Sequence, residues 1–309
     1  MLGRKIKKLK NWLQNRHNLQ LFRLRLAEDR QKTALYRAVL ISHELSATGA
    51  PLMLLAAAEA ILADGGSVRV LAYMDGPLRE KFEKLGIPVF YHPGFRDNAR
   101  LLNEFGGDCA YAVANTAVAY PAVSLLKGPR VLWWIHEAQV IEKDYIARFR
   151  QKKFRPDLEQ TLRQAGKLAV VSDYAREIAA KYNPRVEVIH PAVADVAKEQ
   201  GLQPKQPAEK IRFAMLGAVC EIKGQDVLLK AVRLLPAAYR AQAEFHIAGR
   251  RDGAFAEDLA AESGDLPEVV WEESRSRDNL WDFYRENDVI MVASRDESFS
   301  LVALEACMA

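Results

Sequence analysis

The sequence predicts an α/β protein with two doubly wound parallel-sheet domains. From residue 35 onward, strand-like apolar runs alternate with helical patterns, an order that places parallel strands side by side under covering helices. The alternation stops over the polar stretch ADVAKEQGLQPKQPAEK, which holds two prolines, and then resumes. A break of this composition indicates a linker, and therefore one sheet on each side of it.

We accordingly expect four segments. These are a basic amphipathic segment (1–34), a first Rossmann-like domain (35–194), a linker (195–210) and a second Rossmann-like domain (211–309). The expected strands of the first domain are RAVLIS, SVRVLAY, IPVFYH, CAYAVAN, VLWWIH, KLAVVS and VEVIHP, with helices over Pro51–Asp64 and Tyr174–Tyr182 between them. Those of the second domain are IRFAML, AEFHIA, EVVW and DVIMVA.

The composition is that expected of a soluble protein from a reducing compartment. Its 309 residues are half apolar and 27% charged, as in an ordinary globular protein of about two domains. Cys109, Cys220 and Cys307 are far apart, so they predict neither a disulfide framework nor a metal site, and they suit a cytoplasmic location. The apolar stretch 51–63 contains Glu59 and is too short to span a bilayer. Nothing in the first residues has the form of a signal peptide.

Residues 1–32 are strongly basic. They hold ten Lys/Arg against Glu28 and Asp29, a net charge of +8. Apolar residues recur within them at helical spacing, at Leu2, Ile6, Leu9 and Leu13. This pattern is typical of a basic helix lying on an anionic membrane surface. The alternative is a solvated terminal helix.

Open α/β sheets bind ligands at the carboxyl ends of their strands, so the loops there are the candidate sites. After IRFAML, the strand ends at Gly217, and Lys223-Gly224 precedes a helix marked by Leu228, Leu229, Val232 and Leu235. A lysine at the start of a helix can hold a phosphate. The alternative is a loop lysine beside a turn glycine.

The loop after DVIMVA leads into an apolar helix at the end of the chain. Glu297 is expected at the mouth of this helix and Glu305 within it, with Ser298 and Ser300 as caps. A carboxylate among apolar neighbours needs a partner or an exposed face. The two glutamates could accept hydrogen bonds from sugar or ribose hydroxyls, or Glu305 could simply face solvent.

These motifs together resemble a known family. The segment ESFSLVALE, with two glutamates separated by seven residues, follows the strand-loop-KG-helix unit, and this pair resembles the retaining glycosyltransferases of family 4, which have the GT-B fold. The resemblance covers about residues 36–309. It implies that Lys223 binds the donor diphosphate, that Glu297 lies against the donor sugar and that Glu305 holds the ribose hydroxyls. The implied donor-binding set is Gly49, Ala50, Gly217, Lys223, Glu297, Ser298, Phe299, Ser300 and Glu305.

Two loops of the first domain resemble matching segments of the family. In ISHELSATGAP, Gly49 and Ala50 stand where the family has a glycine-rich loop near the donor phosphates and the acceptor. In VLWWIHE, His136 stands where the family often has a histidine touching the donor sugar, so the implied catalytic residues are His136, Lys223 and Glu297. The alternative is structural: His43 and His136 end strands, and Trp133 and Trp134 serve as core and rim.

The chain departs from the family pattern in two places. Ala218 stands where many members carry an arginine, and Arg250 or Arg251 are candidates to replace that diphosphate contact. The family's second domain usually continues well past the helix of ESFSLVALE. We therefore expect the second domain to be incomplete and Glu305 to be only partly enclosed.

The function implied is retaining transfer of a sugar from a nucleotide-diphosphate sugar to a saccharide or lipid-linked acceptor, in cell-envelope or polysaccharide biosynthesis. No metal, cofactor or nucleic-acid partner is expected. The location expected is cytoplasmic and peripheral on the inner face of the membrane, through residues 1–32. Two alternatives stay open: a sugar-nucleotide epimerase of the same fold, and a non-catalytic, truncated, membrane-associated protein.

Overall fold

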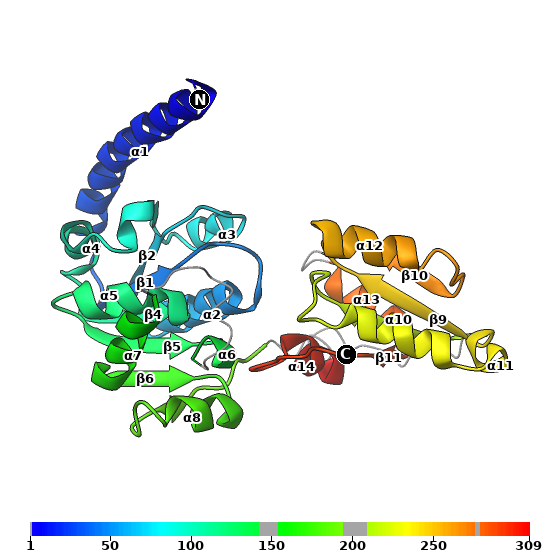
Figure 1. Ribbon diagram of the computed structural model, residues 1–309. Helices are drawn as coiled ribbons and strands as arrows, with labels where there is room; N and C mark the ends of the chain where they lie inside the picture. Colours follow the sequence, from blue (N-terminus) through cyan, green and yellow to red (C-terminus); the bar gives the residue numbers. More distant parts are fainter. Residues whose placement is uncertain (1, 142–153, 194–208, 276–278) are drawn as a thin grey trace. The chain divides into compact units, whose positions relative to one another are not determined.

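The computed structural model describes residues 2–141, 154–193, 209–275 and 279–309. The chain forms two compact units, Met1–Ala192 and Val193–Ala309, and each is built of parallel strands and helices (Figure 1). Most of the expected linker, residues 195–210, lies outside the described residues. No helix in the described part of the chain is both long and apolar enough to span a bilayer.

The first unit contains one sheet of seven strands in the order β3-β2-β1-β4-β5-β6-β7. Each neighbouring pair runs parallel. The central strands are almost wholly buried, as is usual where helices cover both faces. The strands are Arg37–Ser42 (β1), Ser67–Ala72 (β2), Val89–Tyr91 (β3), Tyr111–Asn115 (β4), Arg130–Ile135 (β5), Lys167–Val170 (β6) and Glu187–Val188 (β7).

Helices cover both faces of this sheet. Alternation along β1 sends Leu40 to the face packed by α2 and α3, and Val39 and Ile41 to the face packed by α1, α4 and α5. The helices are Leu2–Asp29 (α1), Gly49–Ala63 (α2), Leu78–Lys84 (α3), Ala99–Gly106 (α4), Tyr120–Leu125 (α5), Ala138–Ile141 (α6), Phe154–Gln164 (α7) and Asp173–Ala179 (α8), with short 3-10 turns at Pro93–Phe95 (η1) and Ala117–Ala119 (η2).

The second unit is a smaller version of the same architecture. Its four parallel strands have the order β10-β9-β8-β11, with α10 and α12 on one face and α13 and α14 on the other. The fold class predicted from the sequence is therefore confirmed. The elements are Ile211–Leu216 (β8), Gln225–Leu234 (α10), Ala237–Arg240 (α11), Ala243–Ala248 (β9), Ala254–Glu262 (α12), Val269–Glu272 (β10), Leu280–Glu286 (α13), Val289–Ile290 (β11) and Leu301–Met308 (α14).

Several expected elements are present with shifted ends. Helix α2 begins at Gly49 instead of Pro51, and α8 ends at Ala179 instead of Tyr182. The run DVIMVA contributes only Val289–Ile290 to the sheet, because β11 pairs with β8 alone and over two residues. The chain then turns toward the loop that follows β8, where the Arg295 N–H donates to the Ile222 carbonyl oxygen at 2.7 Å.

The C-terminal part of α1 belongs to the core of the first unit. Phe22 and Leu26 are buried against the sheet and α4. Arg69 of β2 is fully buried, and its Nε donates to Asp29 Oδ2 at 3.1 Å. Removing one partner of a buried ion pair typically costs about 3–5 kcal/mol. The end of the basic segment is thus an integral part of the fold.

In both units the strand order reverses beside the first strand of the unit. Strand β1 lies between β2 and β4, and β8 lies between β9 and β11. At such a switch point the flanking connections leave on opposite faces of the sheet, which opens a crevice at the carboxyl ends of the strands. The segments that follow β1 and β4, and those that follow β8 and β11, are therefore the places to look for a ligand site.

Candidate active site

In the second unit, the loop after β8 is held by two glycines at which backbones approach closely. A Cβ at Gly249 would lie 1.9 Å from the Gly217 carbonyl oxygen, and one at Gly224 would lie 2.1 Å from the Ala293 carbonyl oxygen. Gly224 also has φ 75°, a left-handed conformation that costs other residues about 1–2 kcal/mol. Only glycine fits these two positions. The close backbone contacts that they allow bring the ends of β8, β9 and β11 together around the start of α10.

The structure brings Lys223 and Glu297 together at this switch point. Lys223 Nζ lies 2.8 Å from Glu297 Oε2, and Ser294 Oγ donates to the same oxygen at 3.2 Å. The two charged side chains are 37% and 28% exposed, so a ligand can reach them. A cation beside a carboxylate offers a contact for a phosphate and an acceptor for a sugar hydroxyl. A bound phosphate would compete with Glu297 for the lysine.

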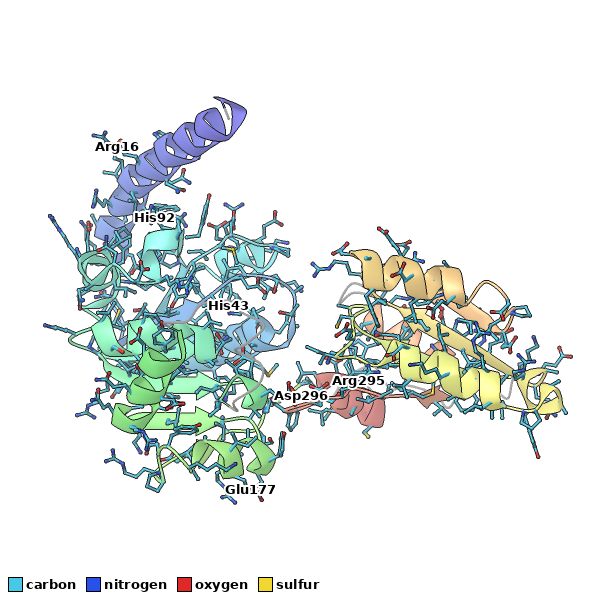
Figure 2. The ribbon with its side chains drawn as sticks, in the orientation of Figure 1. Arg16, His43, His92, Glu177, Arg295 and Asp296 are labelled. Atoms are coloured by element: carbon cyan, nitrogen blue, oxygen red, sulfur yellow. The ribbon has the colours of Figure 1, made fainter. Side chains whose placement is uncertain are left out.

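A second ion pair, which the sequence reasoning missed, ties the loop after β11 to the first turn of α10. Arg295 Nη1 and Nη2 donate to the two carboxylate oxygens of Asp226 at 2.8 and 2.6 Å. Figure 2 labels Arg295 in the second unit. The Arg295 guanidinium lowers the pKa of Asp226 to about 2. The sequence of a polar loop does not show which residue a charged side chain will pair with. Only the fold places Arg295 beside the first turn of α10.

Ser300 caps the terminal helix α14. Its Oγ accepts a hydrogen bond from the Ala303 N–H at 3.1 Å. The prediction that Ser298 also caps this helix is wrong, because Ser298 lies two residues before the cap position, in the loop. Glu297 likewise lies in the loop, together with Phe299.

Glu305 is buried, with 3% of its surface exposed. Its Oε2 accepts a hydrogen bond from the Tyr284 hydroxyl at 2.8 Å. Tyr284 belongs to α13, which packs on the same sheet face as α14 together with Leu280 and Phe283. The expectation of partial enclosure and the alternative of a solvent-facing Glu305 are both wrong, because α13 covers this position. The carboxylate in the apolar helix therefore has a protein partner.

In the first unit, the start of α2 is held by the end of β4. Gly49 and Ala50 are the first two residues of α2, and the fully buried Asn115 donates from Nδ2 to the Ala50 carbonyl oxygen at 2.9 Å. The first turn of a helix leaves backbone N–H groups without intrahelical partners, and these suit an anion. Sequence reasoning did not select Asn115, although a polar residue that ends an apolar strand was a usable signal.

Thr116 follows β4 in a strained conformation. Its φ of 76° is positive, and it is the one non-glycine residue of the described chain with that property. Its carbonyl oxygen accepts from Trp133 Nε1 at 2.8 Å, and its hydroxyl lies 3.3 Å from His43 Nδ1. His43 is labelled in Figure 2. Such strain persists only where the surroundings impose it, and it concentrates at functional sites. Trp133, fully buried, is the core residue that fixes this turn.

His136 and Glu137 lie at the end of β5, the next strand of the sheet. Burial lowers the pKa of His136 to about 3, so its imidazole is neutral at physiological pH. The ring centroid of Trp134 lies 4.6 Å from that of His136, and no described residue forms a hydrogen bond with the buried His136 Nε2. Burial raises the pKa of Glu137, whose Oε2 accepts from the Ala117 N–H at 3.0 Å. A buried nitrogen without a partner among the described residues suits a ligand hydroxyl.

The two arginines considered as replacements at the Ala218 position both have carboxylate partners. Arg250 Nε lies 2.7 Å from Asp252, and Arg251 Nη2 lies 3.0 Å from Glu273. Each guanidinium is therefore already paired with a carboxylate instead of being free to bind a diphosphate. Gly217, in contrast, has no atom within 4 Å of where its Cβ would stand, so a ligand can approach its backbone.

Family models match both units. Residues 36–193 match the model of glycosyl-transferase family 4, and residues 197–309 match that of glycosyl transferases group 1. The chain belongs to glycosyltransferase family 4, as its two motifs predicted.

Particular relatives were found by sequence and by fold. The D-inositol 3-phosphate glycosyltransferase of Mycolicibacterium gilvum is 32% identical over 165 residues, 48% of this chain and 36% of that protein. The same enzyme of Mycolicibacterium vanbaalenii is 35% identical over 143 residues, 40% of this chain and 31% of that protein. The matched part of the chain spans about a third of the length of these curated relatives.

Two solved structures show the same fold. Anabaena HepE in complex with UDP-glucose superimposes with a TM-score of 0.68 at 15% identity, covering 88% of this chain and 78% of that one. WaaG, a glycosyltransferase involved in lipopolysaccharide biosynthesis, has a TM-score of 0.62 at 15% identity, with the same coverage of 88% and 78%. At this level of identity the likeness concerns the fold, which is that of the GT-B glycosyltransferases.

Proposed function

We propose that this chain transfers a sugar from a nucleotide-diphosphate sugar to a saccharide or lipid-linked acceptor with retention of anomeric configuration. The observation that carries the proposal is the accessible Lys223–Glu297 pair at the β8/β11 switch point, beside the start of α10. Family membership supports the reaction class. UDP-glucose is the first donor to test, because it is bound in the HepE structure.

The second unit would bind the donor. Lys223 and the backbone amides at the start of α10 would stabilise the departing diphosphate, where negative charge develops as the glycosidic bond breaks. This requires Lys223 to exchange its contact with Glu297 for one with phosphate, which frees the carboxylate to accept from a sugar hydroxyl. Glu305, held in place by Tyr284, would accept from the ribose hydroxyls. Gly217, Ser298, Phe299 and Ser300 would complete this surface.

The first unit would supply the groups that orient the reacting sugars. His136 is neutral, so it can donate or accept a single hydrogen bond to a donor-sugar hydroxyl without adding charge. The start of α2, at Gly49 and Ala50, would offer its backbone N–H groups to a phosphate or to the acceptor. The family resemblance suggests a role in cell-envelope or polysaccharide biosynthesis. We place the chain on the cytoplasmic side and peripheral to the membrane, because three unpaired cysteines suit a reducing compartment and the first residues are strongly basic.

Incubating the purified chain with a panel of nucleotide sugars, followed by mass spectrometry, tests this proposal. We expect one donor to be retained and slowly hydrolysed to free sugar and nucleotide diphosphate. Lys223→Ala should lose this donor, whereas Lys230→Ala, a change at an exposed lysine of the helix that follows Lys223, should keep it. An epimerase would instead return an isomeric nucleotide sugar without releasing the nucleotide. Retention of no donor at all would contradict the proposal and favour a non-catalytic protein.

A further inference from the structure

Nine of the ten basic residues of the first 32 positions fall into two groups, and Arg16 lies between them. Every lysine or arginine between positions 23 and 32 has a carboxylate partner in the first unit; the pairs are Arg23–Glu104, Arg25–Glu83, Arg30–Asp108 and Lys32–Asp29. Residues 1–13 hold five further basic residues and no acidic one; they are Arg4, Lys5, Lys7, Lys8 and Lys10. The first unit thus compensates the charge of one group, while the other gives its own segment a charge of +5.

The apolar residues in the C-terminal part of α1 lie on two different sides of the helix. Phe22 and Leu26 are 5% and 2% exposed in the core of the first unit, whereas Leu24, between them, is 66% exposed. Two positions correspond to about 200° around a helix. Leu24 therefore lies on the side of α1 that faces away from the first unit.

Further apolar positions lie toward the N-terminus on the side of α1 that carries Leu24. Leu13 precedes Leu24 by about three helical turns, so the two positions share one side of α1. Earlier apolar positions follow the same line at intervals of three or four residues, at Leu2, Ile6 and Leu9. Helix α1 is continuous from Leu2 to Asp29 and extends beyond the elements it packs on (Figure 1).

We propose that the N-terminal half of α1 is an interfacial helix that binds the surface of an anionic lipid bilayer. The apolar line ending at Leu24 would enter the headgroup region, and the five basic residues of 1–13 would contact the anionic headgroups. Residues 23–32 attach the first unit to the other side of the same helix. The inference rests on the peripheral location proposed above, not on the sugar transfer.

The charge of residues 1–13 and the apolar line together favour an anionic bilayer over a second copy of the chain or a nucleic acid as the partner of this helix. A second copy of the chain would bring an equally basic segment against the first, and like charges repel. A nucleic acid would satisfy the basic residues but not the apolar line that runs beside them. A bilayer with anionic headgroups complements both features at once.

Flotation of the full-length chain with vesicles of phosphatidylglycerol and phosphatidylcholine tests the inference. Each lysine near an anionic surface contributes about fivefold to the partition coefficient, so Lys7→Gln/Lys8→Gln should lower it about 25-fold. Lys81→Gln/Lys84→Gln removes the same charge from exposed positions of α3 and should leave partitioning unchanged. Leu24→Gln should lower it without any change of charge. Pure phosphatidylcholine vesicles should bind weakly.

A deletion variant has to respect the docked half of the helix. Removing residues 1–32 would take away Asp29 and leave Arg69 buried without that partner, so loss of binding could reflect unfolding. A chain that begins at residue 14 avoids this and should lose vesicle binding while its circular dichroism and its melting temperature stay close to those of the parent.

Three results would overturn the inference. One is equal binding to neutral and anionic vesicles, another is an equal loss in the α1 and α3 lysine variants, and the third is self-association that disappears on Leu24→Gln in a chain that does not bind vesicles. Calorimetric titration with UDP in the absence of vesicles keeps the two proposals apart. If UDP binds and vesicles do not, the membrane inference alone fails; if vesicles bind and no nucleotide does, the proposed transferase function fails.

Discussion

Replacing Tyr284 by phenylalanine tests whether its hydroxyl holds Glu305 in the second unit. The change removes one oxygen, 2.8 Å from Glu305 Oε2, and leaves the ring in its apolar cluster. Both residues are less than 5% exposed, so water cannot readily replace the lost donor. A hydrogen bond of this kind contributes about 1–3 kcal/mol, the upper part of the range applying to charged partners. We expect Tyr284→Phe to lower the free energy of unfolding by that amount.

Urea unfolding followed by tryptophan fluorescence measures this loss. Trp281 reports on the second unit, because its ring centroid lies 5.8 Å from that of Tyr284. A double-mutant cycle with Glu305→Leu isolates the contribution of the pair. Effects that add within about 0.5 kcal/mol would refute the reasoning, since residues in direct contact are expected to couple by more than this.

Measuring nucleotide affinity then tests whether Glu305 also binds ribose. If Glu305 also binds ribose, Glu305→Gln should weaken UDP binding by about 1.5–3 kcal/mol, because it keeps the shape but loses the charge-assisted hydrogen bonds. Tyr284→Phe should weaken it less, since the carboxylate remains. A Glu305→Gln variant that loses stability but binds UDP normally would make Glu305 a purely structural residue, and the assignment carried over from the family would fail at this position.

Three further predictions concern the other site residues. Lys223→Ala should weaken UDP binding in calorimetry by tens of fold but uridine binding hardly at all, because we propose that its amine contacts the diphosphate; equal losses for both ligands would make Lys223 only a loop residue. Gly224→Ala should destabilise the second unit by more than about 2 kcal/mol in urea unfolding, because it meets both an unfavourable φ and a carbonyl oxygen 2.1 Å away; a smaller effect would mean that the loop relaxes easily. His136 has a pKa of about 3 when folded against an ordinary 6.5, so the unfolded chain binds the extra proton between these values and stability should fall as pH drops below about 6.5. The variant His136→Asn should flatten that slope in unfolding measured from pH 7 to pH 4, and an unchanged slope would show that His136 is not neutral and buried.

Much of this protein could be predicted because the relevant signals are local. Runs of apolar residues identified the strands of both sheets, and the helical spacing of Leu228, Leu229 and Val232 identified α10. Two motifs located Lys223 and Glu297, which the structure joins in an ion pair. Their meeting follows from topology alone, because loops after neighbouring parallel strands emerge at the same edge of a sheet.

Partners from distant segments could not be read from the sequence. Nothing in LWDFYRE indicates that Tyr284 donates to Glu305, nothing in YAVAN shows that Asn115 holds the start of α2, and no local pattern connects Asp29 with Arg69. Each of these contacts depends on which face of a helix or strand meets which neighbour, and that is set by packing over the whole unit. The sequence by itself determined the order of strands and helices and the loops that carry the chemistry. The tertiary structure alone decided which buried polar groups satisfy one another, because a hydrogen bond requires two groups within about 3 Å, and only the folded chain brings residues so far apart in sequence to that distance.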